Sequence, residues 1–209
     1  MKEFLLVDDH VVVRTGLGLM IQQYFQPCTI TEATNGQEAL DRLKEKAFSL
    51  MVLDIHMPDT DALGLMEYVR AQYPNMRVLV YSMGAEHIYA KRFLKAGASG
   101  FVSKEAPLEE IIRAVTLVLD NRKYISEELA MSLANETESS KKSDNPFNRL
   151  SAREFEIATL LLSGKTISEI SRDISIQIST VGTHKARLFE KLGVTNLLEL
   201  KDLANSYHL

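Results

Sequence analysis

Acidic, hydroxyl and basic residues follow short apolar runs in the first half of the sequence, and these residue types suit phosphate chemistry. Two adjacent aspartates, Asp8 and Asp9, follow the apolar run FLLV, and Asp54 follows LMVL. Ser82 and Lys104 follow the later runs VLVY and GFVS. Three carboxylates brought together repel one another unless a cation neutralises them, and hard oxygen ligands of this kind suit Mg²⁺. A nearby lysine and hydroxyl would complete a site for a phosphoryl group, with Asp54 as the nucleophile.

These polar residues meet only if the apolar runs form one parallel sheet. Short apolar runs alternate with amphipathic stretches, which is typical of βα units whose strands are buried on both faces. The carboxyl ends of such strands share one edge of the sheet, where ligands bind. The expected strands are 4–7, 29–33, 50–53, 78–81 and 100–102, and the expected helices are 11–25, 36–46, 61–72, 86–96 and 107–120.

A polar segment separates this first unit from the rest of the chain. Residues 135–148, NETESSKKSDNPFN, include one aromatic and no aliphatic residue. Such a segment buries too little apolar surface to offset the entropy lost on ordering. We therefore expect a first domain over 1–122, a linker over 123–148 with a short helix near 126–134, and a second domain over 149–209.

The sequence after the linker predicts helices alone, near 152–163, 167–174, 178–192 and 196–206. Two capping boxes, Ser151-x-x-Glu154 and Thr166-x-x-Glu169, mark where the first two begin. Only about three residues separate the second helix from the third, and a short turn between two short helices is typical of a helix-turn-helix. The fold class is therefore α/β, a doubly wound five-stranded parallel sheet, followed by a small all-α helix-turn-helix domain.

The third of these helices has two different faces. Val181, Leu188 and Leu192 fall on one side at helical spacing. The opposite side carries Thr180, Thr183, Arg187 and, toward one edge, Lys191. An apolar face docked on its neighbours would leave the polar face for the DNA major groove. Arg187 could reach a base edge or a phosphate there, while Lys185 lies nearer the core side and is expected to extend toward the phosphate backbone.

Composition excludes several classes of protein. The 209 residues are 45% hydrophobic and 25% charged, as in an ordinary globular protein. A single cysteine, Cys28, allows neither a disulfide framework nor a multi-cysteine metal site. No apolar run approaches the roughly 20 residues that span a bilayer, and the apolar run before Asp8 has only four residues, too few for a signal peptide. We expect a cytoplasmic protein with no membrane partner.

The net charge of −4 is unevenly distributed. Residues 147–209 carry eight basic and seven acidic side chains, whereas the preceding residues carry 16 and 21. This asymmetry suggests two units with different partners.

The motifs LLVDDH, VLDIHMPD, VYS and GFVSK, in that order, resemble the receiver domain of bacterial two-component response regulators over about residues 1–122. The resemblance implies that Asp54 accepts a phosphoryl group from a sensor histidine kinase. It also implies that Asp9 and Asp54 bind Mg²⁺ through their carboxylates and His56 through its backbone carbonyl, with Asp8 assisting.

The same resemblance assigns the residues that would respond to the phosphoryl group. Lys104 would pair with the phosphoryl oxygens, Ser82 would turn its hydroxyl toward them, and Phe101 matches the aromatic residue that moves inward with that hydroxyl. His10 stands at a helix start, where we expect it to pack or to cap the helix.

Residues 150–204 resemble the four-helix DNA-binding domain of the LuxR type, so the whole chain is similar to NarL/FixJ-family response regulators. The similarity is carried by LSAREFEI, Gly164, Glu169-Ile170, Thr180-Val181, His184 and KLGV. It implies binding to double-stranded DNA and a homodimer on phosphorylation. The expected DNA contacts are Thr180, Thr183, His184, Lys185, Arg187 and Lys191. Gly182 and Ala186 depart from the family, which often has basic residues at these positions.

The leading hypothesis is a transcription regulator whose dimerisation and DNA binding depend on phosphorylation of Asp54, and which is not an enzyme beyond transfer and hydrolysis of its own phosphoryl group. One alternative is an aspartyl-phosphate phosphatase, which would need an acid two residues beyond the nucleophile, at His56, and a substrate lid. The other alternative is a regulator that binds DNA constitutively and is controlled by protein partners.

Overall fold

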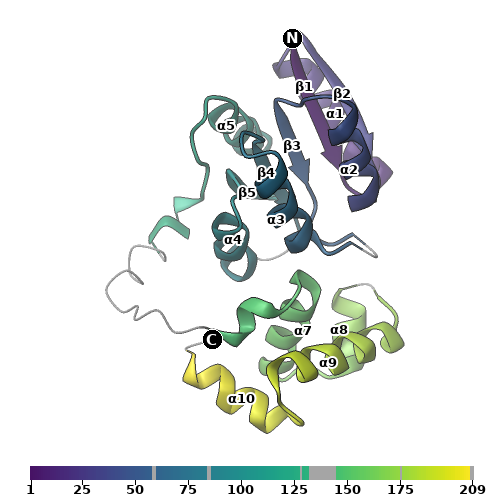
Figure 1. Ribbon diagram of the computed structural model, residues 1–209, viewed down its shortest axis with the longest axis vertical. Helices are drawn as coiled ribbons and strands as arrows, with labels where there is room; N and C mark the ends of the chain where they lie inside the picture. Colours follow the sequence, from purple (N-terminus) through teal and green to yellow (C-terminus); the bar gives the residue numbers. More distant parts are fainter. Residues whose placement is uncertain (58–59, 84–85, 128, 132–144, 175, 208–209) are drawn as a thin grey trace. The chain divides into compact units, whose positions relative to one another are not determined.

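The structure, a computed structural model, describes residues 1–57, 60–83, 86–127, 129–131, 145–174 and 176–207. The chain divides into two compact units, Met1–Ser139 and Ser140–Leu209 (Figure 1). Within the described residues, no helix is both long and apolar enough to cross a membrane.

The first unit is a parallel sheet of five strands, in the order β2-β1-β3-β4-β5. The strands are β1 (Lys2–Val7), β2 (Cys28–Ala33), β3 (Leu50–Leu53), β4 (Val78–Ser82) and β5 (Gly100–Ser103). The chain moves outward from β1 to β2 and then crosses to β3 on the other side of β1. The predicted doubly wound sheet is confirmed, and its topological switch point lies between β1 and β3.

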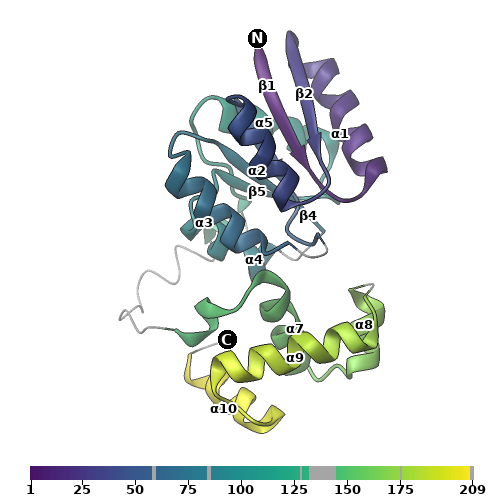
Figure 2. The same cartoon turned by 45° about the vertical axis from the view of Figure 1, so that its right-hand side comes forward.

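Helices cover both faces of the sheet, which is why the central strands are almost entirely apolar. Phe4 and Leu6 of β1 lie in one buried cluster with residues of α1 (Val11–Tyr24) and α5 (Leu108–Leu119). Figure 2 shows the remaining helices together on one side of the sheet. These are α2 (Gly36–Glu45), α3 (Ala62–Gln72) and α4 (Glu86–Lys95).

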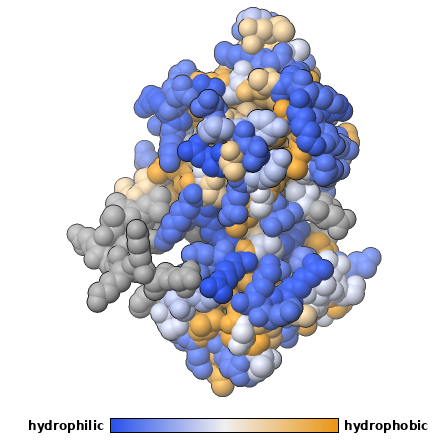
Figure 3. Space-filling model, viewed as in Figure 1, coloured by the Kyte–Doolittle hydropathy of each residue, from blue (hydrophilic) through white to orange (hydrophobic). Residues whose placement is uncertain are grey.

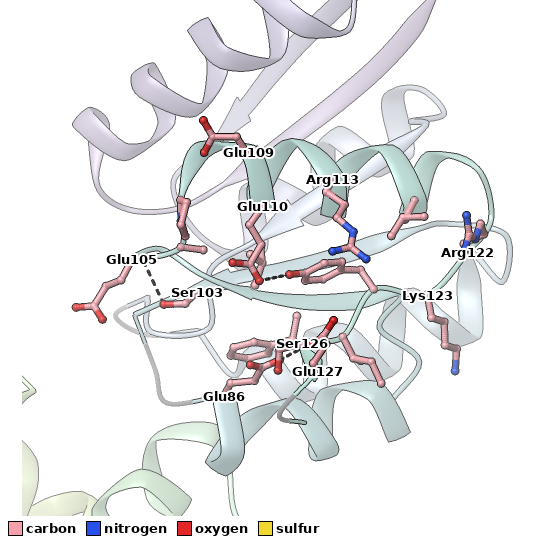
Figure 4. A pocket seen from close by; sticks show the side chains of 17 residues that line it. Glu86, Ser103, Glu105, Glu109, Glu110, Arg113, Arg122, Lys123, Ser126 and Glu127 are labelled. Carbon is pink, nitrogen blue, oxygen red and sulfur yellow. Dashed lines mark hydrogen bonds between the residues drawn. The ribbon is translucent and has the colours of Figure 1, made fainter. Parts of the chain in front are cut away.

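The chain that follows α5 returns to the free edge of β5. The Tyr124 amide donates to the Ser99 carbonyl at 3.0 Å, and the Phe101 amide donates to the Tyr124 carbonyl at 3.3 Å. The Tyr124 hydroxyl donates to Glu110 of α5, and the Ser126 amide donates to Glu86 of α4 at 3.4 Å. A hollow of about 950 Å³ lies between α5, β5 and this returning segment. Figure 4 shows the side chains that line it.

Both ends of the predicted linker, 123–148, contain helical residues and buried side chains. Residues 127 and 129–131 are helical, and Leu129 is buried. Residues 132–134 of the expected helix lie outside the described residues, as do linker residues 135–144. A 3₁₀-helix over Pro146–Arg149 begins the described part of the second unit, with Phe147 only 2% exposed.

In the described part of the second unit, all the regular secondary structure is helical, as predicted. Its helices are α7 (Ala152–Leu162), α8 (Ile167–Asp173), α9 (Ile178–Leu192) and α10 (Leu197–Ser206). Both predicted capping boxes are formed, and Gly164 and Gly193 adopt positive φ where α7 and α9 end. Figure 3 shows apolar surface near α10, on which Leu197 and Leu198 are exposed.

Replacing Gly100 with alanine tests how firmly the returning segment is held. A Cβ at Gly100 would lie 2.8 Å from the Tyr124 carbonyl oxygen, so the backbone of one segment has to move. We expect Gly100→Ala to lower the free energy of unfolding by about 1–3 kcal/mol, the usual effect of overpacking. Urea denaturation followed by circular dichroism measures this change.

The matched control is Gly16→Ala, at an exposed position of α1 where a Cβ would meet nothing within 4 Å. Alanine is the better helix former by about 0.5–1 kcal/mol, so this variant should be more stable than the parent. Equal stability of the two variants would contradict the tight contact at Gly100.

Candidate functional site

The carboxyl edge of the sheet collects the acidic residues that the sequence predicted there. Asp8 follows β1 and Asp54 follows β3, so these two aspartates flank the switch point. Backbone hydrogen bonds extend both strands into the site, from the Asp8 amide to Ala33 at 3.1 Å and from the Asp54 amide to Val7 at 2.8 Å. Asp8 and Asp54 are 5% and 3% exposed, so their charges need partners within the protein.

Lys104, at the end of β5, supplies one such partner. Its Nζ lies 2.5 Å from Asp8 Oδ2 and 2.9 Å from Asp54 Oδ2, and all three side chains are buried. Burial alone would lower the pKa of Lys104, but the charges and hydrogen bonds of Asp54 and Asp8 outweigh it and raise the pKa above its ordinary value. The lysine therefore stays charged and joins the two aspartates.

The other carboxylate oxygen of Asp54 is held by the chain that follows it. Asp54 Oδ1 accepts from the Ile55 amide at 2.7 Å and from the His56 amide at 3.3 Å. These bonds fix the orientation of the carboxylate, because one oxygen faces backbone amides and the other faces Lys104.

Asp9 and His10 border the same cluster on its exposed side. His10 Nδ1 lies 2.9 Å from Asp9 Oδ1 and 3.2 Å from Asp8 Oδ1. The His10 amide also donates to Asp8 Oδ1 at 2.8 Å. One ligand atom each from Asp8, Asp9, His10 and Asp54 can be chosen so that all lie within 4.8 Å of one another.

This donor set suits a divalent cation. Asp8, Asp9 and Asp54 supply three negative charges, and Lys104 offsets only one of them. Oxygen ligands close together with an excess of negative charge are what Mg²⁺ and similar cations bind. The residues present therefore fit the expected metal, with the backbone carbonyl of His56 beside them in sequence.

The imidazole of His56 contacts the predicted switch hydroxyl. His56 Nδ1 lies 2.9 Å from Ser82 Oγ, at the end of β4, and Ser82 is fully buried. The His56 ring also meets the ring of Tyr89 in α4 edge-on, with centroids 5.1 Å apart. The sequence suggested a role for the His56 carbonyl alone, so this contact of its ring was missed.

Phe101 lies in β5, three residues before Lys104, and is fully buried. Its amide bonds to the Tyr124 carbonyl, so the residue predicted to move with Ser82 is hydrogen-bonded to the segment that leaves the first unit.

Arg14 is a further residue of the site that the sequence analysis did not identify. It is 6% exposed, and its guanidinium donates to the Asp8 carbonyl at 2.7 Å and to Glu32 at 2.8 Å. Its position could have indicated this role, because Arg14 lies three residues before Leu17, on the buried face of α1.

The predicted DNA-contacting residues on α9 fall into two groups. Thr180, Thr183 and Arg187 are exposed, whereas Val181 and Leu188 are fully buried on the opposite side. Lys185 is partly buried, with its ammonium 5.2 Å from the centre of the Phe189 ring. An exposed polar face backed by an apolar one is the arrangement that the sequence predicted for this helix.

Lys191 and His184 are turned toward α7. Lys191 Nζ lies 2.7 Å from Glu154 Oε2, and Glu154 is 3% exposed. His184 Nδ1 is buried, with no hydrogen-bond partner among the described residues, and burial and the nearby Arg153 lower the pKa of His184. Both residues therefore contact the helical core of their unit, in addition to any part they take in binding DNA.

Replacing Glu154 with glutamine tests this core contact. Burial alone would raise the pKa of Glu154, but the bonds from Lys191 and Ser151 outweigh it and lower the pKa below its ordinary 4.5. The carboxylate therefore stabilises the fold above pH 4.5, and this contribution is lost as the pH falls through the lowered value. We expect Glu154→Gln to lower the free energy of unfolding by about 1–3 kcal/mol at pH 7, and by less at pH 3.5.

Glu169→Gln is the matched control, because Glu169 occupies the equivalent position of the second capping box but is exposed. Thermal unfolding at both pH values should show a smaller, less pH-dependent loss there. A Glu154→Gln loss that is the same at both pH values would contradict the role of the charge.

Comparison with known proteins matches both units to families. Residues 4–116 match the response regulator receiver domain, and residues 148–204 match the luxR family of bacterial regulatory proteins. Response regulator GacA of Pseudomonas syringae pv. syringae is 31% identical over 204 residues, which cover 98% of this chain and 95% of the relative. Response regulator UvrY of Escherichia coli K12 is 28% identical over 98% of this chain and 94% of the relative.

Solved structures share the fold across both units. RcsB of Salmonella enterica serovar Typhimurium, bound to promoter rprA in the presence of the phosphomimetic BeF₃⁻, superposes with a TM-score of 0.60 at 21% identity, covering 97% of each chain. An RcsB–DNA complex gives a TM-score of 0.59 at 22% identity over 98% of each chain.

Proposed function

This chain belongs to the response regulators that join a receiver domain to a LuxR-family regulatory domain, and we propose that it accepts a phosphoryl group on Asp54 from a sensor histidine kinase. The observation that carries the proposal is the position of Asp54, buried at the switch point beside two further aspartates and bonded to Lys104 at 2.9 Å. The chain is a regulatory protein, and the phosphatase alternative has no support from its family.

Mg²⁺ is the metal we propose for this site. The carboxylates of Asp9 and Asp54 and the backbone carbonyl of His56 would hold it, with Asp8 assisting. The cation would supply positive charge next to the incoming phosphate oxygens and so lower the repulsion between them and the carboxylates. A small all-oxygen set with room for water is the kind of site that Mg²⁺ occupies.

In the transfer step, a carboxylate oxygen of Asp54 forms a bond to phosphorus while the phosphorus–nitrogen bond of the kinase phosphohistidine breaks. The proton that the leaving imidazole needs comes from the kinase or from solvent. Lys104 already contacts Asp54, so its ammonium needs only a short movement to pair with a phosphoryl oxygen. The same contacts support hydrolysis of the phosphoryl group by water as the one further reaction of this chain.

The response begins with an exchange of hydrogen bonds at Ser82. Its hydroxyl now bonds to the His56 ring, so turning toward a phosphoryl oxygen requires that this bond break. Phe101 is already fully buried, so the exchange would shift its ring within the interior. Because His56 also contacts Tyr89, the exchange biases the position of α4 as well.

The output is dimerisation and DNA binding that regulate transcription. We place α9 in the major groove of double-stranded DNA, with Thr180, Thr183 and Arg187 nearest the bases and His184, Lys185 and Lys191 toward the backbone. RcsB, which shares the fold, is bound to DNA in its solved complexes. The exposed Leu197 and Leu198 of α10 suit a contact between two copies. A regulator of this kind works in the bacterial cytoplasm.

Intact mass and solution size test the phosphorylation switch directly. The full chain, incubated with Mg²⁺ and a small phosphodonor such as phosphoramidate, should gain one phosphoryl group and shift from monomer to dimer in size-exclusion chromatography. Asp54→Asn should show neither change. Phosphorylation without a change in size would move the switch from dimerisation to unmasking of α9. No phosphorylation at all would contradict the proposal and favour a regulator controlled by partners.

Two cationic residues of α9 provide a matched test of DNA recognition. Both side chains are exposed, but only Lys191 is bonded to the buried Glu154. Arg187→Ala should therefore weaken binding by about 1–3 kcal/mol and Lys191→Ala by less. Fluorescence anisotropy, on duplexes selected from a random pool by the phosphorylated protein, measures both. A larger loss of affinity for Lys191→Ala, in a variant that remains folded by circular dichroism, would show that Lys191 leaves Glu154 to contact DNA.

A further inference from the structure

A second hollow of the first unit lies at the amino ends of β4 and β5, the end of the sheet opposite to Asp54. Its volume is about 550 Å³. Three stretches of the chain line it: the end of α3 with the turn that leads to β4, the turn that leads to β5, and the end of α5 with the residues after it. This volume falls within the range of about 300–1,000 Å³ that is usual for small-molecule pockets.

The charge of this hollow is positive, although the unit that contains it is acidic. Four cationic side chains line it, those of Arg70, Arg77, Arg122 and Lys123, and none of the described residues that line it is acidic. None of the four pairs with a carboxylate among the described residues. Figure 4 shows Arg122 and Lys123 well apart from Glu109 at the beginning of α5. Like charges gathered in a concave surface attract an anion.

Two of the arginines are held by neutral partners, which fix the side chains without neutralising their charge. Arg77 donates through Nε to Asn121 Oδ1 at 2.8 Å and through a terminal nitrogen to the Ser49 carbonyl at 3.2 Å. Arg70 donates to the Pro74 carbonyl at 2.9 Å. A guanidinium carries five N–H donors, so both side chains keep donors for a ligand.

The backbone of two turns brings the cations together. Gly97 has a φ of 110°, and the stem of Arg70 lies across it, since a Cβ there would be 2.9 Å from Arg70 Cδ. Asn121 has a φ of 60° and ends α5 in the left-handed conformation, which turns Arg122 and Lys123 back toward the sheet. The arrangement is therefore built by the fold and not by chance proximity of long side chains.

We propose that this cationic hollow, formed by Arg70, Arg77, Arg122 and Lys123, binds a small anion that carries two or more phosphate groups, such as a nucleoside diphosphate. The planar fork of arginine donates two parallel hydrogen bonds to a phosphate group, and three arginines with a lysine can serve more than one such group. The cations share one hollow of small-molecule size, whereas a protein or DNA partner buries a much larger surface.

This site is separate from the phosphorylation site, because the two lie at opposite ends of the strands. It does adjoin the segment that leads to the second unit. Ser99 lines the hollow, and its carbonyl accepts from the amide of Tyr124, the residue after Lys123. A bound anion would thus lie against the start of β5 and against the residues that follow α5.

Isothermal titration of the full chain with inorganic pyrophosphate tests the inference. In metal-free buffer the carboxylates around Asp54 repel the anion, which leaves the cationic hollow as the expected site. Arg122→Gln/Lys123→Gln is the informative double variant, because both side chains are exposed and their replacement does not threaten the fold. It should weaken pyrophosphate binding at least about tenfold, since hydrogen bonds between charged groups are strong.

Arg42→Gln/Lys44→Gln in α2 is the matched control. It removes the same two charges from exposed side chains that already pair with Glu45 and Asp41. Pyrophosphate affinity should stay within about twofold of the parent, because these cations are already partnered and lie outside the hollow. An equal loss in both double variants would overturn the inference, since binding would then follow net charge alone. No binding by the parent chain would overturn it as well.

Two further measurements identify the anion and its place. Inorganic phosphate should bind at least about tenfold more weakly than pyrophosphate, because it carries less charge and fewer acceptors. In ¹⁵N NMR, pyrophosphate should shift the amides of Gly97, Ser99 and Asn121. Shifts confined to the surroundings of Asp54 would overturn the inference. A random-sequence DNA duplex that loses affinity in Arg122→Gln/Lys123→Gln, when pyrophosphate does not bind, would overturn it in favour of a contact with the DNA backbone.

Discussion

The bond between Lys104 and the two buried aspartates, Asp8 and Asp54, is the interaction on which the first unit depends. Parallel strands necessarily bring their carboxyl ends to one edge, and three carboxylates at that edge would repel one another without a cation. The lysine offsets part of that charge in the absence of metal. Lys104 is bonded to both aspartates. A group that binds at Asp54 therefore also changes the electrostatic interactions of Asp8 and of Lys104 at the end of β5. Before any ligand arrives, the site thus keeps an excess of negative charge, of which Lys104 offsets one part.

In the second unit, one buried carboxylate takes part in two stabilising interactions. Glu154 caps α7 through Ser151 and also binds Lys191 of α9, 37 residues away in sequence. One buried carboxylate therefore fixes where α7 begins and how α9 lies against it. This contact with α7 holds the exposed polar face of α9 in position. A helix needs such support if a few of its side chains are to meet base edges at fixed positions.

Much of this arrangement follows from local pattern, and the remainder depends on contacts between distant residues. Apolar runs of strand length and their order along the chain suffice to predict the sheet and to place Asp8, Asp54 and Lys104 at one edge. Two capping boxes suffice to mark where α7 and α8 begin. The direction of the His56 ring depends on Ser82 and Tyr89, which no local pattern relates to it. The pairing of Lys191 with Glu154 likewise depends on how α9 packs against α7, which no local pattern predicts. Local sequence predicts which residues gather, whereas tertiary packing decides which atoms of them meet.

The contact of Tyr124 with β5 affects where the chain can be truncated and whether the truncated protein aggregates. A chain cut at Arg122, where α5 and its turn are complete, would leave the Ser99 carbonyl and the Phe101 amide without their partners at the border of the sheet. Unpaired strand borders invite a strand from another molecule. In the intact chain the isolated bridge between Tyr124 and Gly100 occupies this part of the edge, so the segment that leads to the second unit also opposes edge-to-edge association.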